Sequence, residues 1–102
     1  MLAQVRMYTI NKGKMDVFLK QFEEVVIPMH ARINLPIAGT WVNRPQNEFI
    51  WVRSFTDEAD REAKLKAFQD LRDSEGIVLG TEVTKMEIRE VESLFVPSTS
   101  AV

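Results

Sequence analysis

The sequence has no cysteine, a single histidine and no long apolar run, and each of these features argues against a class of site or protein. With zero cysteines among 102 residues, disulfide bonds and thiolate metal sites are excluded. A lone histidine, His30, has no paired ligand spacing, so we expect no metal site and no cofactor. No segment approaches the roughly 20 apolar residues of a membrane-spanning helix, and Met1 to Arg6 lacks the apolar run of a signal peptide. We therefore expect a cytoplasmic protein without a membrane span.

The chain also lacks a surplus of positive charge. Its 13 lysine and arginine residues face 15 acidic residues, which leaves a formal net charge of −2. Proteins that bind nucleic acid need basic side chains to neutralise phosphates, so we expect no nucleic-acid partner. What is present is an ordinary globular composition, 45% hydrophobic and 27% charged, in a length suited to one domain. We predict a single domain over residues 1–96 and a flexible tail over 97–102.

Two periodicities in the sequence predict the order of the elements. Alternation with a period of two residues predicts four strands, at 5–10, 39–42, 48–55 and about 83–91. Apolar residues spaced by three and four predict two helices, at about 15–33 and from a cap at 56 or 57 to 73–76. The resulting order is that of the ferredoxin-like βαββαβ fold. We predict an α+β domain with a four-stranded antiparallel sheet and two helices on one face.

Two local signals refine the helices. Pro28 falls inside the first helical pattern, where it removes a backbone donor and crowds the preceding turn. This predicts a kink or a local break near Val25 to Ile27. Thr56 or Asp57 precedes the second helix and is expected to cap its first amides. Its apolar stripe, expected to be buried, consists of Ala63, Ala67, Phe68 and Leu71.

The two faces of the predicted sheet must differ, because both helices cover the same one. We assign six aliphatic side chains to the covered face: Val5, Met7, Ile50, Val52, Met86 and Ile88. On this assignment the open face carries aromatic and charged residues: Arg6, Tyr8, Trp51, Arg53, Lys85, Glu87 and Arg89. Such a patch would be unusual on a monomer. Packing it against an identical sheet predicts a two-fold homodimer.

Three stretches carry a family resemblance: the strand–turn–helix opening at 5–14, the segment from Phe22 to Pro28, and the strand-to-helix junction at 50–63. They resemble the NIPSNAP family, within the wider dimeric α/β-barrel group. Gly39-Thr40-Trp41 fits the second strand of that family, whereas Arg72 to Gly76 lacks the tryptophan that members often carry after the second helix. The resemblance covers most of residues 5–92. It implies a homodimer whose two sheets close into a barrel, and no settled reaction. The wider group includes cofactor-independent monooxygenases and haem-degrading enzymes.

Aromatic and charged residues form the candidate ligand site: Arg6, Tyr8, Trp41, Trp51, Arg53 and Glu87. The aromatic rings either line a pocket or pack in the dimer interface. Arg6 and Arg53 lie on neighbouring strands of the predicted enclosed face, where two guanidiniums need carboxylates or an anionic ligand. Glu87 is the internal partner if the arginines belong to an ion-pair network. The alternative is a clamp for a substrate.

His30 is the candidate catalytic residue, because imidazole is the side chain that titrates near neutral pH. One interpretation is a general base at the mouth of a cavity. The other is a half-buried histidine that caps the last turns of the first helix.

Three functions follow from these residues. The first is a homodimeric barrel of undefined activity that binds a small apolar or anionic molecule between its two sheets. The second is a cofactor-independent monooxygenase-like enzyme, which requires His30 to reach the same cavity as Trp51. The third is a structural or adaptor module without a cavity, in which Leu94 to Pro97 serves as a docking tail.

Overall fold

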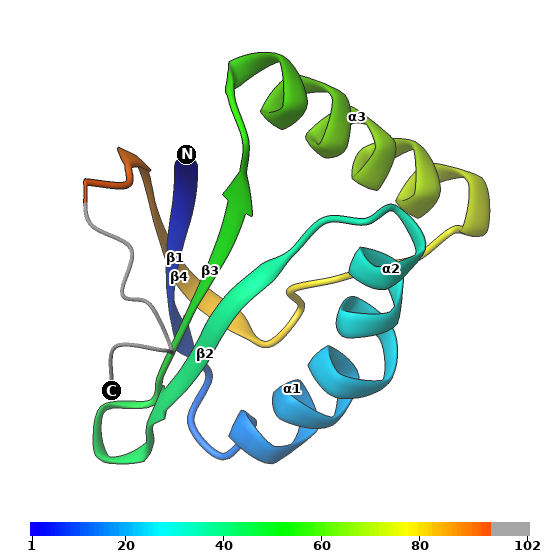
Figure 1. Cartoon of the computed structure of the whole chain (residues 1–102). Helices are drawn as coiled ribbons and strands as arrows, with labels where there is room; N and C mark the ends of the chain where they lie inside the picture. The colour runs from blue at the N-terminus through cyan, green and yellow to red at the C-terminus, as the bar shows by residue number, and fades with distance from the viewer. Residues whose placement is uncertain (95–102) are drawn as a thin grey trace.

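The computed structural model describes residues 1–94 of the chain. Four strands form one antiparallel sheet in the order β2-β3-β1-β4, and the helices lie on one side of it (Figure 1). The elements are β1 (Leu2–Ile10), α1 (Met15–Gln21), the π-helical turn η1 (Phe22–Val26), α2 (Ile27–Arg32), β2 (Ile37–Asn43), the 3-10 turn η2 (Arg44–Gln46), β3 (Glu48–Phe55), α3 (Glu58–Glu75) and β4 (Val83–Glu92). The ferredoxin-like α+β fold is confirmed. The expected boundary at 96 and the tail at 97–102 lie outside the described residues.

The first helical segment contains the distortion expected near Pro28. Between α1 and α2 the chain widens into η1, and the Ile27 amide donates to the Phe22 carbonyl, five residues back. Pro28 has no amide hydrogen and its ring crowds the preceding turn, so it is tolerated only near the start of a helix. It occupies such a place in the first turn of α2. The widened turn therefore allows the apolar stripe to continue across the position of Pro28.

The start of α3 is stabilised by reciprocal hydrogen bonds. Asp57 is the N-cap, and its carboxylate accepts from the Asp60 amide at 2.8 Å. The Asp60 carboxylate accepts in turn from the amide of Thr56, the residue before the N-cap, at 2.9 Å, in an arrangement similar to a capping box. At the other end, Gly76 adopts a left-handed conformation with φ of 63°. Local signals therefore set both ends of α3.

The apolar stripe of α3 is less buried than expected. Ala63 is exposed, Ala67, Phe68 and Leu71 are half-buried, and no residue of α3 is fully buried. By contrast, α1 and η1 bury Met15, Phe18, Phe22 and Val26 in the main core. The first helical segment thus supplies the helical part of the main core.

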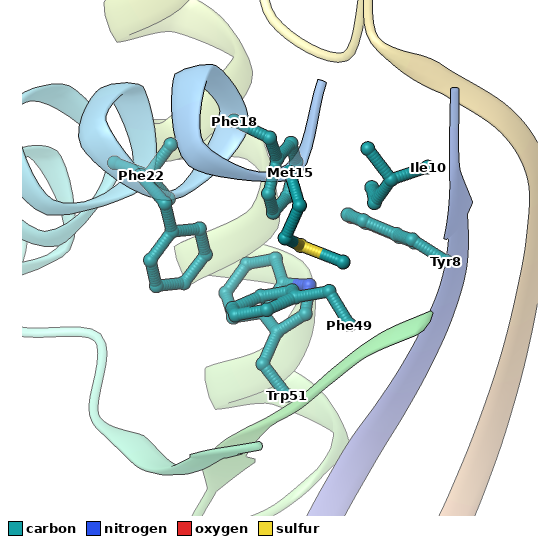
Figure 2. Close-up of a cluster of buried hydrophobic side chains, with 8 residues drawn as sticks. Tyr8, Ile10, Met15, Phe18, Phe22, Phe49 and Trp51 are labelled. Carbon is teal, nitrogen blue, oxygen red and sulfur yellow. The ribbon is translucent and has the colours of Figure 1, made fainter. Parts of the chain in front are cut away.

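The core lies on the face of the sheet opposite to the one expected. Tyr8, Phe49 and Trp51 point from the sheet toward Met15, Phe18 and Phe22 (Figure 2). Along β3 the odd-numbered residues are the buried ones: Phe49, Trp51, Arg53 and Phe55. The aliphatic residues assigned to the helices face the other way and are half-buried: Val5, Met7, Ile50 and Val52. Aromatic side chains bury about 150–250 Å² each, so covering them removes more apolar surface from water than covering the aliphatic set.

The assignment of β4 was correct. Met86 pairs with Tyr8 and Ile88 pairs with Arg6, which places both on the helix-facing side. They remain 44% and 40% exposed, because β4 is an edge strand that the helices cover poorly. The helix-facing side therefore opens toward solvent at β4.

Candidate functional site

A cavity of about 110 Å³ lies between the helix-facing side of the sheet and the helices. Its lining is mostly aromatic and aliphatic with several polar groups: Arg6, Tyr8, Phe18, Gln21, Phe22, Val26, Trp51, Arg53, Phe68, Arg72, Leu79, Gly80 and Met86. No acidic side chain is among these described lining residues. Apolar walls with a few convergent polar groups are typical of small-molecule sites.

Strand register brings the sheet residues of the cavity together. Arg6 pairs with Trp51 across β1 and β3, and Gln4 pairs with Arg53. Arg6 and Tyr8 are two residues apart on β1, so their side chains share one face. The Arg53 guanidinium carbon lies 5.0 Å from the centre of the Trp51 ring, and the Arg6 carbon lies 5.7 Å from the same ring. These are cation–π distances.

The helices supply the opposite walls in pairs that are four residues apart. Phe22 and Val26 come from η1, and Phe68 and Arg72 come from α3. Side chains at this spacing lie on one face of a helix. The widened turn therefore belongs to the cavity wall, which agrees with the frequent placement of π-helical turns at functional sites.

A single neutral oxygen accepts from both arginines. The Gln4 Oε1 atom accepts from Arg6 Nη1 at 3.1 Å, from Arg53 Nε at 3.0 Å, and from Arg53 Nη2. Arg6 Nε also donates to the Tyr8 hydroxyl at 2.7 Å. On its other side, the Gln4 amide nitrogen donates to Glu90 at 2.7 Å. Gln4 thus lies between the two arginine cations and the Glu90 carboxylate.

Arg53 is a buried cation with neutral partners. It is 4% exposed, and besides Gln4 its Nη1 atom lies 3.4 Å from His30 Nε2. Burial first, and then the neighbouring charge of Arg6, lower the pKa of Arg53 to about 10. The guanidinium therefore keeps its charge at neutral pH in a place where a charge is costly.

His30 is fully buried behind this arginine, at 1% exposure. Its Nδ1 atom lies 2.7 Å from the Val26 carbonyl, so Nδ1 carries the proton and Nε2 accepts from Arg53. Burial is the main cause that lowers the pKa of His30 to about 4, and the charges of Arg53 and Arg6 add to it. The ring contacts Trp51 at a centroid distance of 5.3 Å. The prediction of a half-buried histidine is thus wrong, because His30 is fully buried. It is a neutral member of the network behind the cavity.

Two of the candidate residues lie on the other face of the sheet. Trp41 is 55% exposed on β2, and its ring covers Gly39 so closely that it would clash with a Cβ added there. Glu87 is opposite Met7, and it pairs with Lys85 at 3.1 Å and Arg89 at 3.8 Å. The ion pairs expected between Glu87 and the cavity arginines are absent from the described residues, because strand alternation points Glu87 away from them.

Sequence reasoning missed the polar residues Gln4 and Arg72. Gln4 lies two positions before Arg6, so the alternation of β1 already placed it on the same face. Arg72 lies one helical turn after Phe68, and both line the cavity. No cluster of three or more metal-ligating side chains occurs in residues 1–94. Within that same range no helix has the length and apolar character to cross a membrane.

Comparison with known proteins places this chain in a family. A family model described as NIPSNAP matches residues 3–101. The chain belongs to the NIPSNAP family. An uncharacterized NIPSNAP domain protein from Burkholderia xenovorans is 20% identical, with a TM-score of 0.73 over 96% of this chain and 100% of that chain. A NIPSNAP family protein with unknown function from Agrobacterium tumefaciens is 19% identical, with a TM-score of 0.77 over 95% and 92%.

The fold extends beyond NIPSNAP proteins. A structure described as an antibiotic biosynthesis monooxygenase is 16% identical, with a TM-score of 0.63 over 95% of this chain and 100% of that chain. No match was found among curated proteins. At these identities the neighbours share a fold, and a fold does not carry an activity with it. The function of this NIPSNAP protein therefore has to be argued from its own residues.

Proposed function

We propose that this NIPSNAP protein binds a small ring-containing organic molecule in the cavity between the sheet and the helices. The observation that carries the proposal is the enclosure of Tyr8, Trp51 and Arg53 in one cavity with apolar helical walls. The proposed ligand site is thus inside the protomer. The sequence had instead indicated a site between the sheets of two protomers. The reason is the reversed sheet face: the aromatic side points at the helices.

The size of the cavity limits the ligand. An apolar cavity of about 150 Å³ holds one benzene molecule, so a cavity of about 110 Å³ has room for no more than one ring. Met86 lines the cavity and is 44% exposed, which puts a mouth at β4. A longer ligand would extend through this mouth.

The fluorescence of Trp51 tests the proposal. Trp41 and Trp51 are the two tryptophans, so Trp41→Phe leaves Trp51 as the sole reporter. We expect benzamide to change its emission saturably. A Val26→Phe change fills the cavity and should weaken binding at least about tenfold, whereas Val17→Phe on the exposed side of α1 should not. A folded Val26→Phe variant that binds as well as its control would exclude the cavity.

A homodimer through the open face of the sheet is part of the proposal. Half-buried Val5, Met7, Ile50 and Val52 lie in adjacent rows there, beside the exposed ring of Trp41. A contiguous apolar patch of this kind favours association with a copy of itself, and a core of this size gains stability from a partner subunit. In the proposed dimer the interface is therefore formed by aliphatic side chains, whereas the sequence had predicted an interface of aromatic and charged ones. A cytoplasmic location remains the expectation from composition.

Sedimentation tests the dimer. Ile50→Asp places a charge in the centre of the open face and should leave a monomer at micromolar concentration. Thr40→Asp, on the helix-facing side of β2, is the matched control and should sediment like the unmodified chain. A wild-type chain that is monomeric at these concentrations would contradict the proposal.

A cofactor-independent monooxygenase-like enzyme is the second candidate function. It is favoured by the contact of buried His30 with Trp51 and Arg53. Against it, Nε2 already accepts from Arg53, and a pKa of about 4 makes a weak base at neutral pH. Oxygen uptake with hydroquinone, a substrate that supplies its own electrons, tests it. Uptake that His30→Gln abolishes would support this function; no uptake above the buffer rate would remove it. The purely structural adaptor is disfavoured by the presence of a cavity.

A further inference from the structure

The arginines of this chain divide into two groups by their partners. Among the seven arginines of the sequence, four have a carboxylate partner in residues 1–94: Arg32 with Glu75, Arg44 with Asp16, Arg61 with Glu90, and Arg89 with Glu87. The other three line the cavity and make no ion pair within that part of the chain: Arg6, Arg53 and Arg72. The unpaired arginines are therefore gathered in one place that also lacks an acidic lining residue.

We propose that this cavity holds the carboxylate of a small aromatic acid, bound by Arg6 and Arg53. The inference rests on the proposed binding function and names its ligand class. A buried cation without a counter-charge is unfavourable, and an anion entering the cavity would remove that cost. Arginine presents planar pairs of donors that match a carboxylate. The two guanidiniums meet at Gln4, so their donors converge on one point.

The hydrogen bonds at Gln4 show a shortage of acceptors. An amide oxygen has two lone pairs, yet Gln4 Oε1 accepts from three guanidinium nitrogens. The weak sulfur acceptor of Met86 takes a further donor, Arg6 Nη2, at 3.2 Å. A carboxylate offers about four acceptor sites and a full charge to the same donors. It would therefore relieve Gln4 and replace the sulfur contact.

Unused donors point to the same conclusion. The indole nitrogen of Trp51 is buried and has no hydrogen-bond partner among the described residues, although the side chain is 3% exposed. The Nε atom of Arg72 is in the same condition. Both residues line the cavity. Buried donors without acceptors are uncommon in folded proteins, and a bound acceptor is one of the explanations for them.

The remaining walls specify the rest of the ligand. Phe18, Phe22 and Phe68 surround the arginine pair with ring surfaces. The cavity volume suits one ring, which leads to a benzoate-sized acid. The phosphate group of an aryl phosphate is larger than a carboxylate and can carry a second negative charge. An aromatic carboxylate therefore fits the volume of this cavity better.

Paired probes of equal shape test the charge. In the Trp41→Phe background, titrations with benzoate and benzamide compare a charged and a neutral head on the same ring. We expect benzoate to bind at least about tenfold more tightly. Arg6→Met and Arg53→Met should each remove at least about tenfold of benzoate affinity while leaving benzamide within about threefold. Arg44→Met, whose arginine lies outside the cavity, is the matched control.

Each outcome decides between the two proposals. Equal affinity for benzoate and benzamide would overturn the carboxylate site and leave ring binding intact. Absence of binding by both probes would overturn both. If Arg53→Met does not fold, Arg6→Met alone carries the test, and unchanged benzoate affinity in a folded Arg6→Met variant overturns the proposal. Tighter binding of phenyl phosphate or inorganic phosphate than of benzoate would overturn the assignment to carboxylates.

Discussion

The two faces of the sheet use charge and apolar surface in opposite ways. On the helix-facing side, Arg6 and Arg53 lie among aromatic rings, and the nearest described acceptors are neutral. On the open side, Lys85 and Arg89 flank Glu87 in exposed ion pairs, next to aliphatic residues. Exposed pairs of this kind contribute little to stability. Buried charges without a counter-charge are costly, and ionisable groups with strongly shifted pKa values often occur at functional sites. The comparison agrees with the proposals that the covered face binds a ligand and that the open face is used for assembly.

The largest effect should separate two neighbours on β3. Phe49→Ala should lower the free energy of unfolding by about 3–5 kcal/mol, because its ring packs against Phe18 and Phe22 at centroid distances of 4.9 and 4.8 Å. Ile50→Ala, on the open face, should cost about 1 kcal/mol at low protein concentration and more where dimers form. Urea unfolding at two protein concentrations measures both. Equal losses of unfolding free energy for both variants at every concentration would contradict the different roles of the two faces.

The pH dependence of stability should report the buried His30. Its pKa is about 6.5 in the unfolded chain and is lowered to about 4 in the fold, so the unfolded state binds an extra proton between these values. Stability from the neutral ring is therefore complete above pH 6.5 and is lost as the pH falls toward 4. The loss amounts to about 3 kcal/mol.

His30→Gln provides the comparison for this pH effect, because glutamine stays neutral throughout. Carboxylates titrate in both proteins, so the difference between their unfolding curves isolates the histidine. We expect the difference in the free energy of unfolding to shrink from pH 7 to pH 4. A constant difference would mean that His30 titrates normally in the fold and is not part of the covered face.

Arg53→Met should raise the stability of the ligand-free protein by about 1–2 kcal/mol, since methionine fills the volume without a buried charge. Arg89→Met, in an exposed pair on the open face, should change it by less than about 0.5 kcal/mol. Thermal unfolding of both variants makes the comparison. A strongly destabilised Arg53→Met protein would show that Arg53 contributes to the stability of the fold, and the ligand proposal would then be tested with Arg6→Met alone.

The smallest effect concerns the helix that completes the covered face. Asp57→Ala removes the side chain that accepts from the Asp60 amide and should cost about 1 kcal/mol. Because no residue of α3 is fully buried, local capping has a large share in its stability. Hydrogen exchange should show faster opening of α3 with α1 unaffected. Equal acceleration in both helices would contradict a local stabilising role for this cap.

The elements were predictable because their signals are local. The alternation of β3, the proline that widens the turn before α2, and the capping aspartate each act within a few residues. The adjacency of Arg6 and Arg53 was also predictable from strand order. The shortage of acceptors around them was not, because it depends on both arginines sharing the Gln4 oxygen and on the lack of acidic groups among the described lining residues from the helices.

The sequence by itself determined the order of strands and helices, the distortion at Pro28 and the NIPSNAP membership, since all three are carried by short patterns along the chain. Tertiary structure alone decided which face of the sheet the helices cover. Both faces of β1 are apolar enough to be buried, and alternation is symmetric between them. The choice followed from total buried surface, where the rings of Tyr8, Phe49 and Trp51 outweigh Val5, Met7 and Ile50.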